Sequence, residues 1–271
     1  MKKLKDKLNS VRNYTSKFDS LLNRMPALGK VLSSIFGQLE LLILESVRIL
    51  ERKFKIQIYF SLTNKILKRK WGGKIIPLGK NLNPETYFLP SQKIISLLSR
   101  SNVVGISKCY CRETQHKYLE RSNFDNPIET CIHISFGKSL KEIPYKSENL
   151  RKVSKDEIIT LLEECEERGL IHQIIFFPNP NFYYVICNCC PCCCVVLKKF
   201  LEMGAPPVVK SDFISLTDLN SCNNCGICTN WCYFKARVIK EDKLYFESDR
   251  CFGCGLCVSK CPKNAISLVS K

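Results

Sequence analysis

CNNCGICTNWC at residues 222–232 and CFGCGLCVSKC at residues 251–261 repeat one cysteine spacing, C-x2-C-x2-C-x3-C. An iron–sulfur cubane needs four thiolates around one small volume, and this spacing supplies three from a tight loop and a fourth from further along the chain. Zinc sites instead favour C-x2-C pairs separated by a longer loop. Gly226 and Gly255 follow the second cysteine of each run and let the loop turn tightly. The two runs therefore predict two [4Fe–4S] clusters rather than two zinc ions.

Residues 212–270 resemble the bacterial-type two-cluster ferredoxins. Ala236 and Ala265 lie at matching offsets after the fourth cysteine of each run, whereas Tyr233 stands where the second run has Pro262. In that family the fourth cysteine of each run ligates the other cluster. The resemblance therefore implies two ligand sets: Cys222, Cys225, Cys228 and Cys261 for one cluster, and Cys251, Cys254, Cys257 and Cys232 for the other.

The chain has 18 cysteines in 271 residues, and its N-terminus indicates whether they lie in an oxidising or a reducing compartment. In a short secreted protein they would indicate a disulfide scaffold, but the basic start MKKLKDK is followed by polar residues instead of the apolar segment of a signal peptide. We therefore expect metal-binding cysteines in a reducing compartment. The predicted location is the cytoplasm, either free or peripheral on the inner face of the membrane.

A formal charge of +17 is concentrated at the N-terminal end, where residues 1–80 contain 18 Lys and Arg but 5 Asp and Glu. Residues 3–24 and 30–52 read as helices, and the second has one broad apolar face. This helix could pack in a core or a dimer, or lie on an anionic membrane surface. Nucleic-acid binding is disfavoured because no recognisable reading motif accompanies the charge. The sequence does not fix the oligomeric state.

The element pattern predicts an α+β protein in three parts. Residues 1–75 form a basic helical N-terminal region, residues 76–210 a Cys-rich central α/β domain with a hairpin, and residues 211–271 a ferredoxin-type (βαβ)2 dicluster domain. In the central part, residues 103–106 read as a buried strand. A capping box at Ser154 opens a helix that Gly169 ends. Residues 171–177 and 182–186 form the expected hairpin, and a further helix is expected at 195–203.

Nine cysteines form a second constellation in the central domain. Thiolates crowded this closely repel one another unless a cation neutralises them, so the run 187–194 indicates metal binding. The helix expected after this run would add N–H donors and positive dipole. The nine suffice for two [4Fe–4S] clusters with one spare, or for one cluster plus a residual redox or zinc site. We favour at least one additional Fe–S cluster, with zinc as the alternative. The candidate ligands are Cys109, Cys111, Cys131, Cys187, Cys189, Cys190, Cys192, Cys193 and Cys194.

Residues 75–271 as a whole resemble a group of multi-cluster ferredoxin proteins of anaerobic bacteria and archaea. The motifs that carry this resemblance are KCYCR at 108–112, an isolated Cys131, and ICNCCPCCC at 186–194. The resemblance implies Fe–S binding and electron transfer but supplies no substrate. We expect Arg112 to neutralise cluster charge or to form a surface ion pair. His133 is more often structural than a ligand in such a position, and Cys165 reads as a buried small hydrophobic residue.

Electron transfer is the function that these features favour, either as a carrier or as an electron-transfer subunit of an anaerobic oxidoreductase system. The basic surface would then dock an acidic redox partner. No nucleotide-binding or hydrolase motif is found, and no catalytic residue can be named. The alternatives are a redox-sensing regulatory protein that binds membrane or nucleic acid through its N-terminal helices, and an oxidoreductase with a substrate at the central cysteines.

Overall fold

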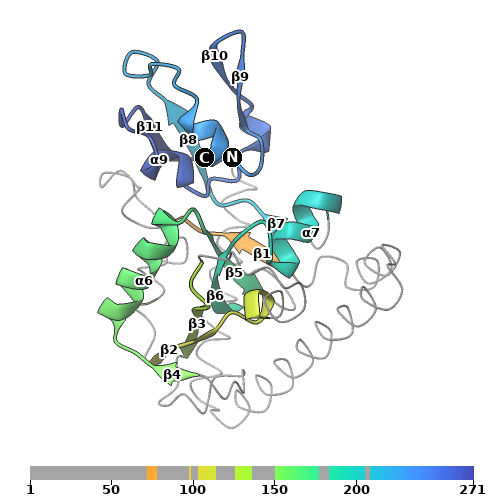
Figure 1. Cartoon of the computed structure of the whole chain (residues 1–271), viewed down its shortest axis with the longest axis vertical. Helices are drawn as coiled ribbons and strands as arrows, with labels where there is room; N and C mark the ends of the chain where they lie inside the picture. The colour runs from red at the N-terminus through yellow and green to blue at the C-terminus, as the bar shows by residue number, and fades with distance from the viewer. Residues whose placement is uncertain are drawn as a thin grey trace, which may run out of the picture.

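The computed structural model describes residues 72–77, 98, 103–113, 126–135, 150–176, 183–204 and 208–271. The predicted helices at 3–24 and 30–52 lie outside these ranges. Within the described ranges the chain mixes helices and strands in a larger central sheet and a smaller C-terminal unit (Figure 1). No helix in these ranges has the length and apolar character that crossing a membrane requires.

The central sheet has seven strands in the order β4-β2-β3-β6-β5-β1-β7. All neighbours pair antiparallel except β1 and β7. The α/β description of this domain was therefore wrong in detail, because hairpin-type pairing replaces the parallel crossovers of α/β sheets. The strands are β1 (Gly72–Ile75), β2 (Val103–Lys108), β3 (Glu129–Ser135), β4 (Arg151–Lys152), β5 (Ile171–Phe176), β6 (Tyr183–Cys189) and β7 (Val208–Val209).

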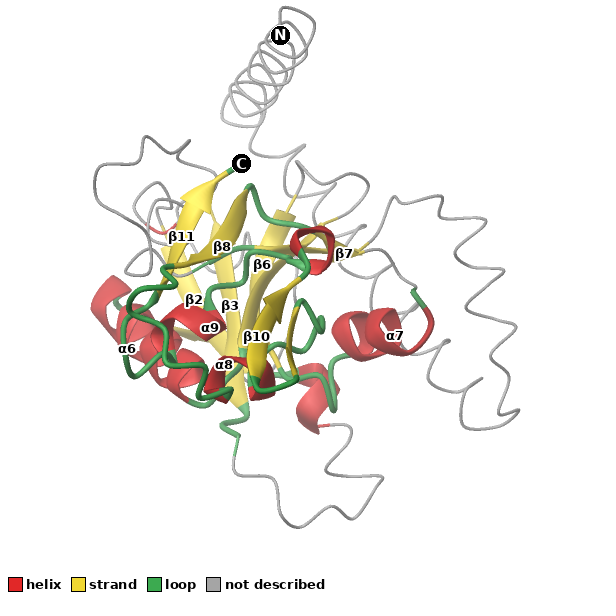
Figure 2. Cartoon of the chain, turned by 90° about the horizontal axis from the view of Figure 1, so that it is seen from above, coloured by secondary structure: helices red, strands yellow, loops and turns green. Residues whose placement is uncertain are grey.

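Two helices cover opposite faces of this sheet. Helix α6 (Lys155–Glu167) begins where Ser154 accepts a hydrogen bond from the Glu157 backbone N–H, as the capping box predicts. It packs against Ile174 and Ile186, whereas α7 (Val195–Met203) packs against Ile171 and Ile175. Successive strand residues point to opposite faces, so α6 and α7 lie on different sides (Figure 2).

The predicted hairpin and the second helix are confirmed. Strands β5 and β6 pair antiparallel from Ile171 opposite Cys189 to Phe176 opposite Tyr183. Helix α7 starts at Val195 and ends before Gly204, which has a positive φ of 73°. Gly169 ends α6 with a φ of 75°. Strand β1 lies at the end of the range predicted as the N-terminal region and joins the central sheet.

The C-terminal unit runs in the order β-α-β-β-α-β. Its elements are β8 (Phe213–Thr217), α8 (Ile227–Asn230), β9 (Arg237–Lys240), β10 (Lys243–Phe246), the 3-10 turn η4 (Ser248–Arg250), α9 (Leu256–Ser259) and β11 (Ile266–Ser270). Strands β8 and β11 pair antiparallel, as do β9 and β10. The cysteine loops lead into α8 and α9, and each of these short helices is preceded by a glycine with positive φ, Gly226 and Gly255.

The end of α6 makes one of the contacts between the two units. The Tyr233 hydroxyl donates to the Gly169 carbonyl at 3.0 Å, and the Lys260 ammonium donates to the Glu167 carbonyl at 2.5 Å. The Trp231 ring packs so closely on Gly169 that a Cβ there would lie 2.1 Å from it. Tyr233, the residue that departs from the proline of the second run, thus serves the packing of the ferredoxin-like unit on the central domain.

Candidate metal centres

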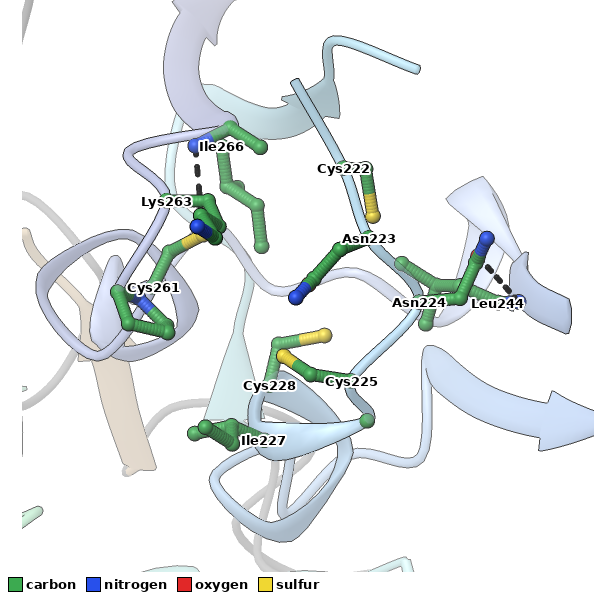
Figure 3. Close-up of a pocket in the computed structure, with 13 residues that line it drawn as sticks. Cys222, Asn223, Asn224, Cys225, Ile227, Cys228, Leu244, Cys261, Lys263 and Ile266 are labelled. Atoms are coloured by element: carbon green, nitrogen blue, oxygen red, sulfur yellow. Dashed lines mark hydrogen bonds between the residues drawn. The ribbon is translucent and has the colours of Figure 1, made fainter. Parts of the chain in front are cut away.

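The C-terminal unit brings four of the predicted ligands around one cavity. Cys222, Cys225 and Cys228 line it from the first run, and Cys261 approaches from the second (Figure 3). Cys225 is exposed, so this site lies near the surface. Four thiols from two loops around one hollow are the donor set that a [4Fe–4S] cluster takes.

The other four C-terminal cysteines lie deeper. The negative charges of Cys257, Cys232 and Cys251 all act on Cys254, so these thiols are neighbours. Burial raises the pKa of Cys257 to about 11. A free thiol there stays protonated, whereas a cluster iron would hold it as thiolate. The structure thus brings Cys222, Cys225, Cys228 and Cys261 to one cavity and places Cys254 near Cys232, Cys251 and Cys257.

Backbone N–H groups support the fourth cysteine of each run. The Ala236 N–H donates to the Cys232 sulfur at 3.2 Å, and the Ala265 N–H donates to the Cys261 sulfur at 3.3 Å. Both alanines are buried, which leaves no room for a larger side chain. The matching alanines in the sequence therefore mark two equivalent hydrogen bonds of the kind that tune a cluster's potential.

Arg237 is the buried cation of this unit, at 1% exposure. It donates to the hydroxyls of Thr217 at 2.6 Å and Ser215 at 2.9 Å. Its positive charge acts on Cys228 of one set and on Cys257 of the other. A guanidinium placed between two sets of thiolates offsets part of their negative charge.

Six of the nine central cysteines form a closed ring of thiol contacts. Cys109 contacts Cys111 and Cys131, and Cys189 contacts Cys187 and Cys194. The Cys111–Cys194 and Cys131–Cys187 contacts close the ring. We call these residues the six-cysteine ring. Its members are Cys109, Cys111, Cys131, Cys187, Cys189 and Cys194.

The period of the sheet explains why the ring forms. Cys131 and Cys187 are opposite each other on β3 and β6, and Cys189 lies two residues further along β6. Residues two apart share a face, so these thiols lie on the α7 side. Cys194 is the N-cap of α7, and its sulfur accepts from the Leu197 N–H at 3.4 Å. The predicted helix N-terminus at the cysteines is therefore present.

Gln173 is a site residue that the sequence analysis missed. It is fully buried on the α7 side, and its amide nitrogen donates to the sulfurs of Cys189 at 3.0 Å and Cys194 at 3.3 Å. Gly73 on β1 leaves the space that this side chain fills, since a Cβ there would lie 2.3 Å from the Gln173 Oε1. The signal in the sequence was Gln173 itself, which together with His172 interrupts an otherwise apolar strand.

Gln173→Leu is expected to lower the reduction potential of a cluster bound at the six-cysteine ring by on the order of 50–100 mV, because amide donors stabilise the more negative reduced state. Gly73→Ala should shift it in the same direction by displacing Gln173. An EPR-monitored redox titration measures both, with Gly204→Ala as the control. Equal potentials in all four proteins would rule out tuning by the amide.

Arg112 is buried at 1% exposure, so the alternative of a surface ion pair is wrong. It donates to the Pro127 carbonyl, to the Thr130 hydroxyl at 3.1 Å and to the Asn188 carbonyl at 2.9 Å. Burial acts to lower the pKa of Arg112, but the negative charges of Cys109, Cys190 and Cys189 outweigh it and raise that pKa. The guanidinium therefore carries its charge beside cysteines.

His133, predicted to be structural, and His172 take structural positions. His133 Nε2 lies 2.8 Å from the Ser107 hydroxyl, and burial lowers the pKa of His133 to about 3. His172 Nδ1 lies 2.6 Å from the Asn188 Oδ1. His116 lies outside the described residues. None of the 18 cysteines, all of which lie in described ranges, forms a disulfide.

The remaining central ligand candidates, Cys190, Cys192 and Cys193, are not part of the ring. Their sulfurs lie within 4.8 Å of one another. Cys190 and Cys193 are buried and pack with Cys165 and Leu170. Cys165 was predicted as a buried hydrophobic residue; it is buried, yet its neighbours are thiols.

Comparison with known protein families matches one segment of the chain. Residues 221–266 match the 4Fe-4S dicluster domain. Comparison with curated proteins gave no match. The C-terminal segment is thus an iron–sulfur, ferredoxin-like domain, and together with the cysteine groups it supports an iron–sulfur electron-transfer protein.

Proposed function

We propose that the protein transfers electrons through two [4Fe–4S] clusters in the C-terminal unit and a further Fe–S cluster at the six-cysteine ring. It would act as a carrier or as an electron-transfer subunit of an anaerobic oxidoreductase system. One-electron exchange is the chemistry that cysteine-bound clusters supply. The side chains contribute ligation, hydrogen bonds to sulfur and charge balance.

The observation that carries this proposal is one continuous packed cluster between the units. Cys187, Cys189 and Cys194 of the ring share it with Cys254 of the deeper ferredoxin set, together with Phe234, Leu256 and Phe252. Phe234 and Phe252 stack at 4.0 Å between ring centroids. Packed side chains join these thiols, which would give electrons a route through the protein interior between the two units.

Arg112 supports an anionic centre in the central domain. A buried guanidinium costs several kcal/mol unless negative charge accompanies it. The oxygens to which it donates, the Pro127 carbonyl, the Thr130 hydroxyl and the Asn188 carbonyl, are neutral. Thiolates bound to iron would supply the missing charge, and they are the nearest acidic groups that act on it.

The surface near Cys225 suits partner docking. Ile227, which lines the same cavity as Cys225, is exposed, as are Ile239 and Leu219, which lies three positions before Cys222. Lys263 lines the same cavity as Cys225. An acidic redox protein would be steered by basic residues at low salt and held by apolar contact. We propose that the protein lies inside the cell, where its thiols stay reduced, and that its basic N-terminal region contacts the inner face of the membrane.

Iron and acid-labile sulfide per chain test the proposal after anaerobic purification. The wild-type protein should hold more than about eight sulfides, the number that two cubanes contain. Cys189→Ala should return the count to that value and remove the corresponding EPR signal.

Val185→Ala is the matched control, because Val185 is buried on the same strand and the same face as Cys189 but carries no thiol. It should keep the wild-type sulfide content. If the wild-type protein holds eight sulfides and Cys189→Ala holds the same number, the third cluster is contradicted, whereas the two clusters of the ferredoxin-like unit are not.

A further inference from the structure

The central cysteines separate into two groups on opposite faces of the sheet. Cys189 ends β6 and points to the α7 side, where it packs with Ile171 and Val196. Cys190 follows it and packs on the α6 side with Cys165 and Leu170. Adjacent residues of an extended chain point in opposite directions, so the change of face between 189 and 190 is expected. The second group is thus a site of its own.

The spacing of the second group suits one ion. The sulfurs of Cys190, Cys192 and Cys193 lie within 4.8 Å of one another. Four sulfurs at 2.3 Å from a tetrahedral metal lie about 3.8 Å apart. A cubane core holds its four thiolates further apart, and no three of the eight ferredoxin-like cysteines, all in described ranges, meet the 4.8 Å spacing.

Cys165 is the further thiol that packs on this group, although its sulfur is not among the three that lie within 4.8 Å of one another. It lies in the last turn of α6, is 0% exposed, and packs with Cys190 and Cys193, while Cys192 lies against the same group. Its carbonyl accepts from the Leu170 N–H at 2.9 Å, which fixes the turn that carries it. Burial raises the pKa of the Cys165 thiol to about 12, so without a metal it is an uncharged thiol.

We propose that Cys165, Cys190, Cys192 and Cys193 bind a single tetrahedral metal ion, zinc or mononuclear iron. This site does not depend on the cluster proposed for the six-cysteine ring. Four thiolates and a divalent ion carry a net charge of −2, and the charge of Cys190 acts on Arg112 beside them. Arg112 would then stand between two anionic centres, as Arg237 does between the two ferredoxin-like sets.

The position of the site gives it a structural consequence. It would tie the end of α6 to the loop between β6 and α7. The same end of α6 receives the hydrogen bonds from Tyr233 and Lys260 of the C-terminal unit. A metal at Cys165 would therefore hold the surface on which the ferredoxin-like unit docks.

Metal analysis of the full-length protein, purified anaerobically, tests the site. The wild type should hold one zinc, or one iron in excess of the cluster iron, per chain. Cys192→Ala and Cys165→Ala should each lose that one ion and keep the sulfide content of the wild type. Leu161→Ala is the control for folding, because Leu161 packs on the same thiols without offering a ligand. It should retain the ion.

X-ray absorption at the zinc edge, or Mössbauer spectroscopy if the ion is iron, gives an independent readout. Four sulfur neighbours at about 2.3 Å are expected in the wild type, and three plus a lighter atom in Cys165→Ser. Loss of four irons and four sulfides in Cys192→Ala would overturn the single ion in favour of a cubane. An ion retained in Cys165→Ala but lost in Cys192→Ala would remove Cys165 from the ligands. A wild-type protein without the extra ion would overturn the site. An extra ion together with only eight sulfides would support the single-ion site and would contradict only the cluster at the six-cysteine ring.

Discussion

Arg112→Met is expected to destabilise the metal-loaded protein by about 3–5 kcal/mol, the cost of leaving buried charge without its partner. The substitution keeps an unbranched apolar stem but removes the cation that Cys109, Cys190 and Cys189 act on. Removing a positive charge also disfavours the reduced, more negative centre, so the potential of the central site should fall. Anaerobic calorimetry and a redox titration measure the two effects.

Two control variants separate the charge of Arg112 from its packing. Arg112→Lys keeps the charge but loses the forked contacts to Pro127, Thr130 and Asn188, so its potential should stay closer to the wild type than that of Arg112→Met. Arg151→Met removes an exposed arginine that pairs with Glu129 and Glu157, and should cost no more than about 1 kcal/mol. A methionine variant with wild-type stability, metal content and potential would show that Arg112 balances no charge.

Gly253→Ala is expected to cost about 3–4 kcal/mol and to deplete the deeper ferredoxin-like cluster, combining a left-handed backbone with a steric clash. Gly253 has a φ of +64°, and a Cβ there would lie 2.2 Å from both the Phe213 carbonyl oxygen and the Ser211 hydroxyl. The backbone carbonyl cannot move aside without disturbing β8. Because Gly253 lies between Cys251 and Cys254, the loop that presents these thiols must shift.

Gly204→Ala is the matched control for this prediction. Gly204 has a similar φ of +73°, but a Cβ there meets nothing within 4 Å. Its cost should be about 1–2 kcal/mol, from backbone strain alone. Sulfide analysis and the midpoint of thermal unfolding compare the two variants. Equal losses in both would show that the contact with Phe213 and Ser211 contributes nothing.

The ferredoxin-like unit could be predicted almost completely from sequence because its ligands are local. Each run supplies three thiols within seven residues, and the glycines and alanines around them have fixed places in the loop. The helix opened by Ser154 and the hairpin around residues 171–186 were also predictable, since caps, glycines and β-rich runs are local signals.

The central site could not be predicted to the same depth because its arrangement depends on strand pairing. The spacing of residues 187–194 says nothing about which thiols share a face, and the sheet order that brings Cys131 beside Cys187 is a non-local property. Burial of Arg112 and the donation from Gln173 follow from the same pairing. Cys165 was interpreted apart from the other cysteines because it lies 22 positions before Cys187 in the sequence.

Strand β6 separates the two groups of cysteines, because its alternate residues point to opposite faces of the sheet. A shift of one residue in its register with β5 would send Cys187 and Cys189 to the α6 side, away from Gln173, and carry Cys190 toward the opposite side. Both proposed centres would be lost together. Insertions and deletions within 183–190 should therefore be excluded from functional versions of this chain, even where every cysteine is kept.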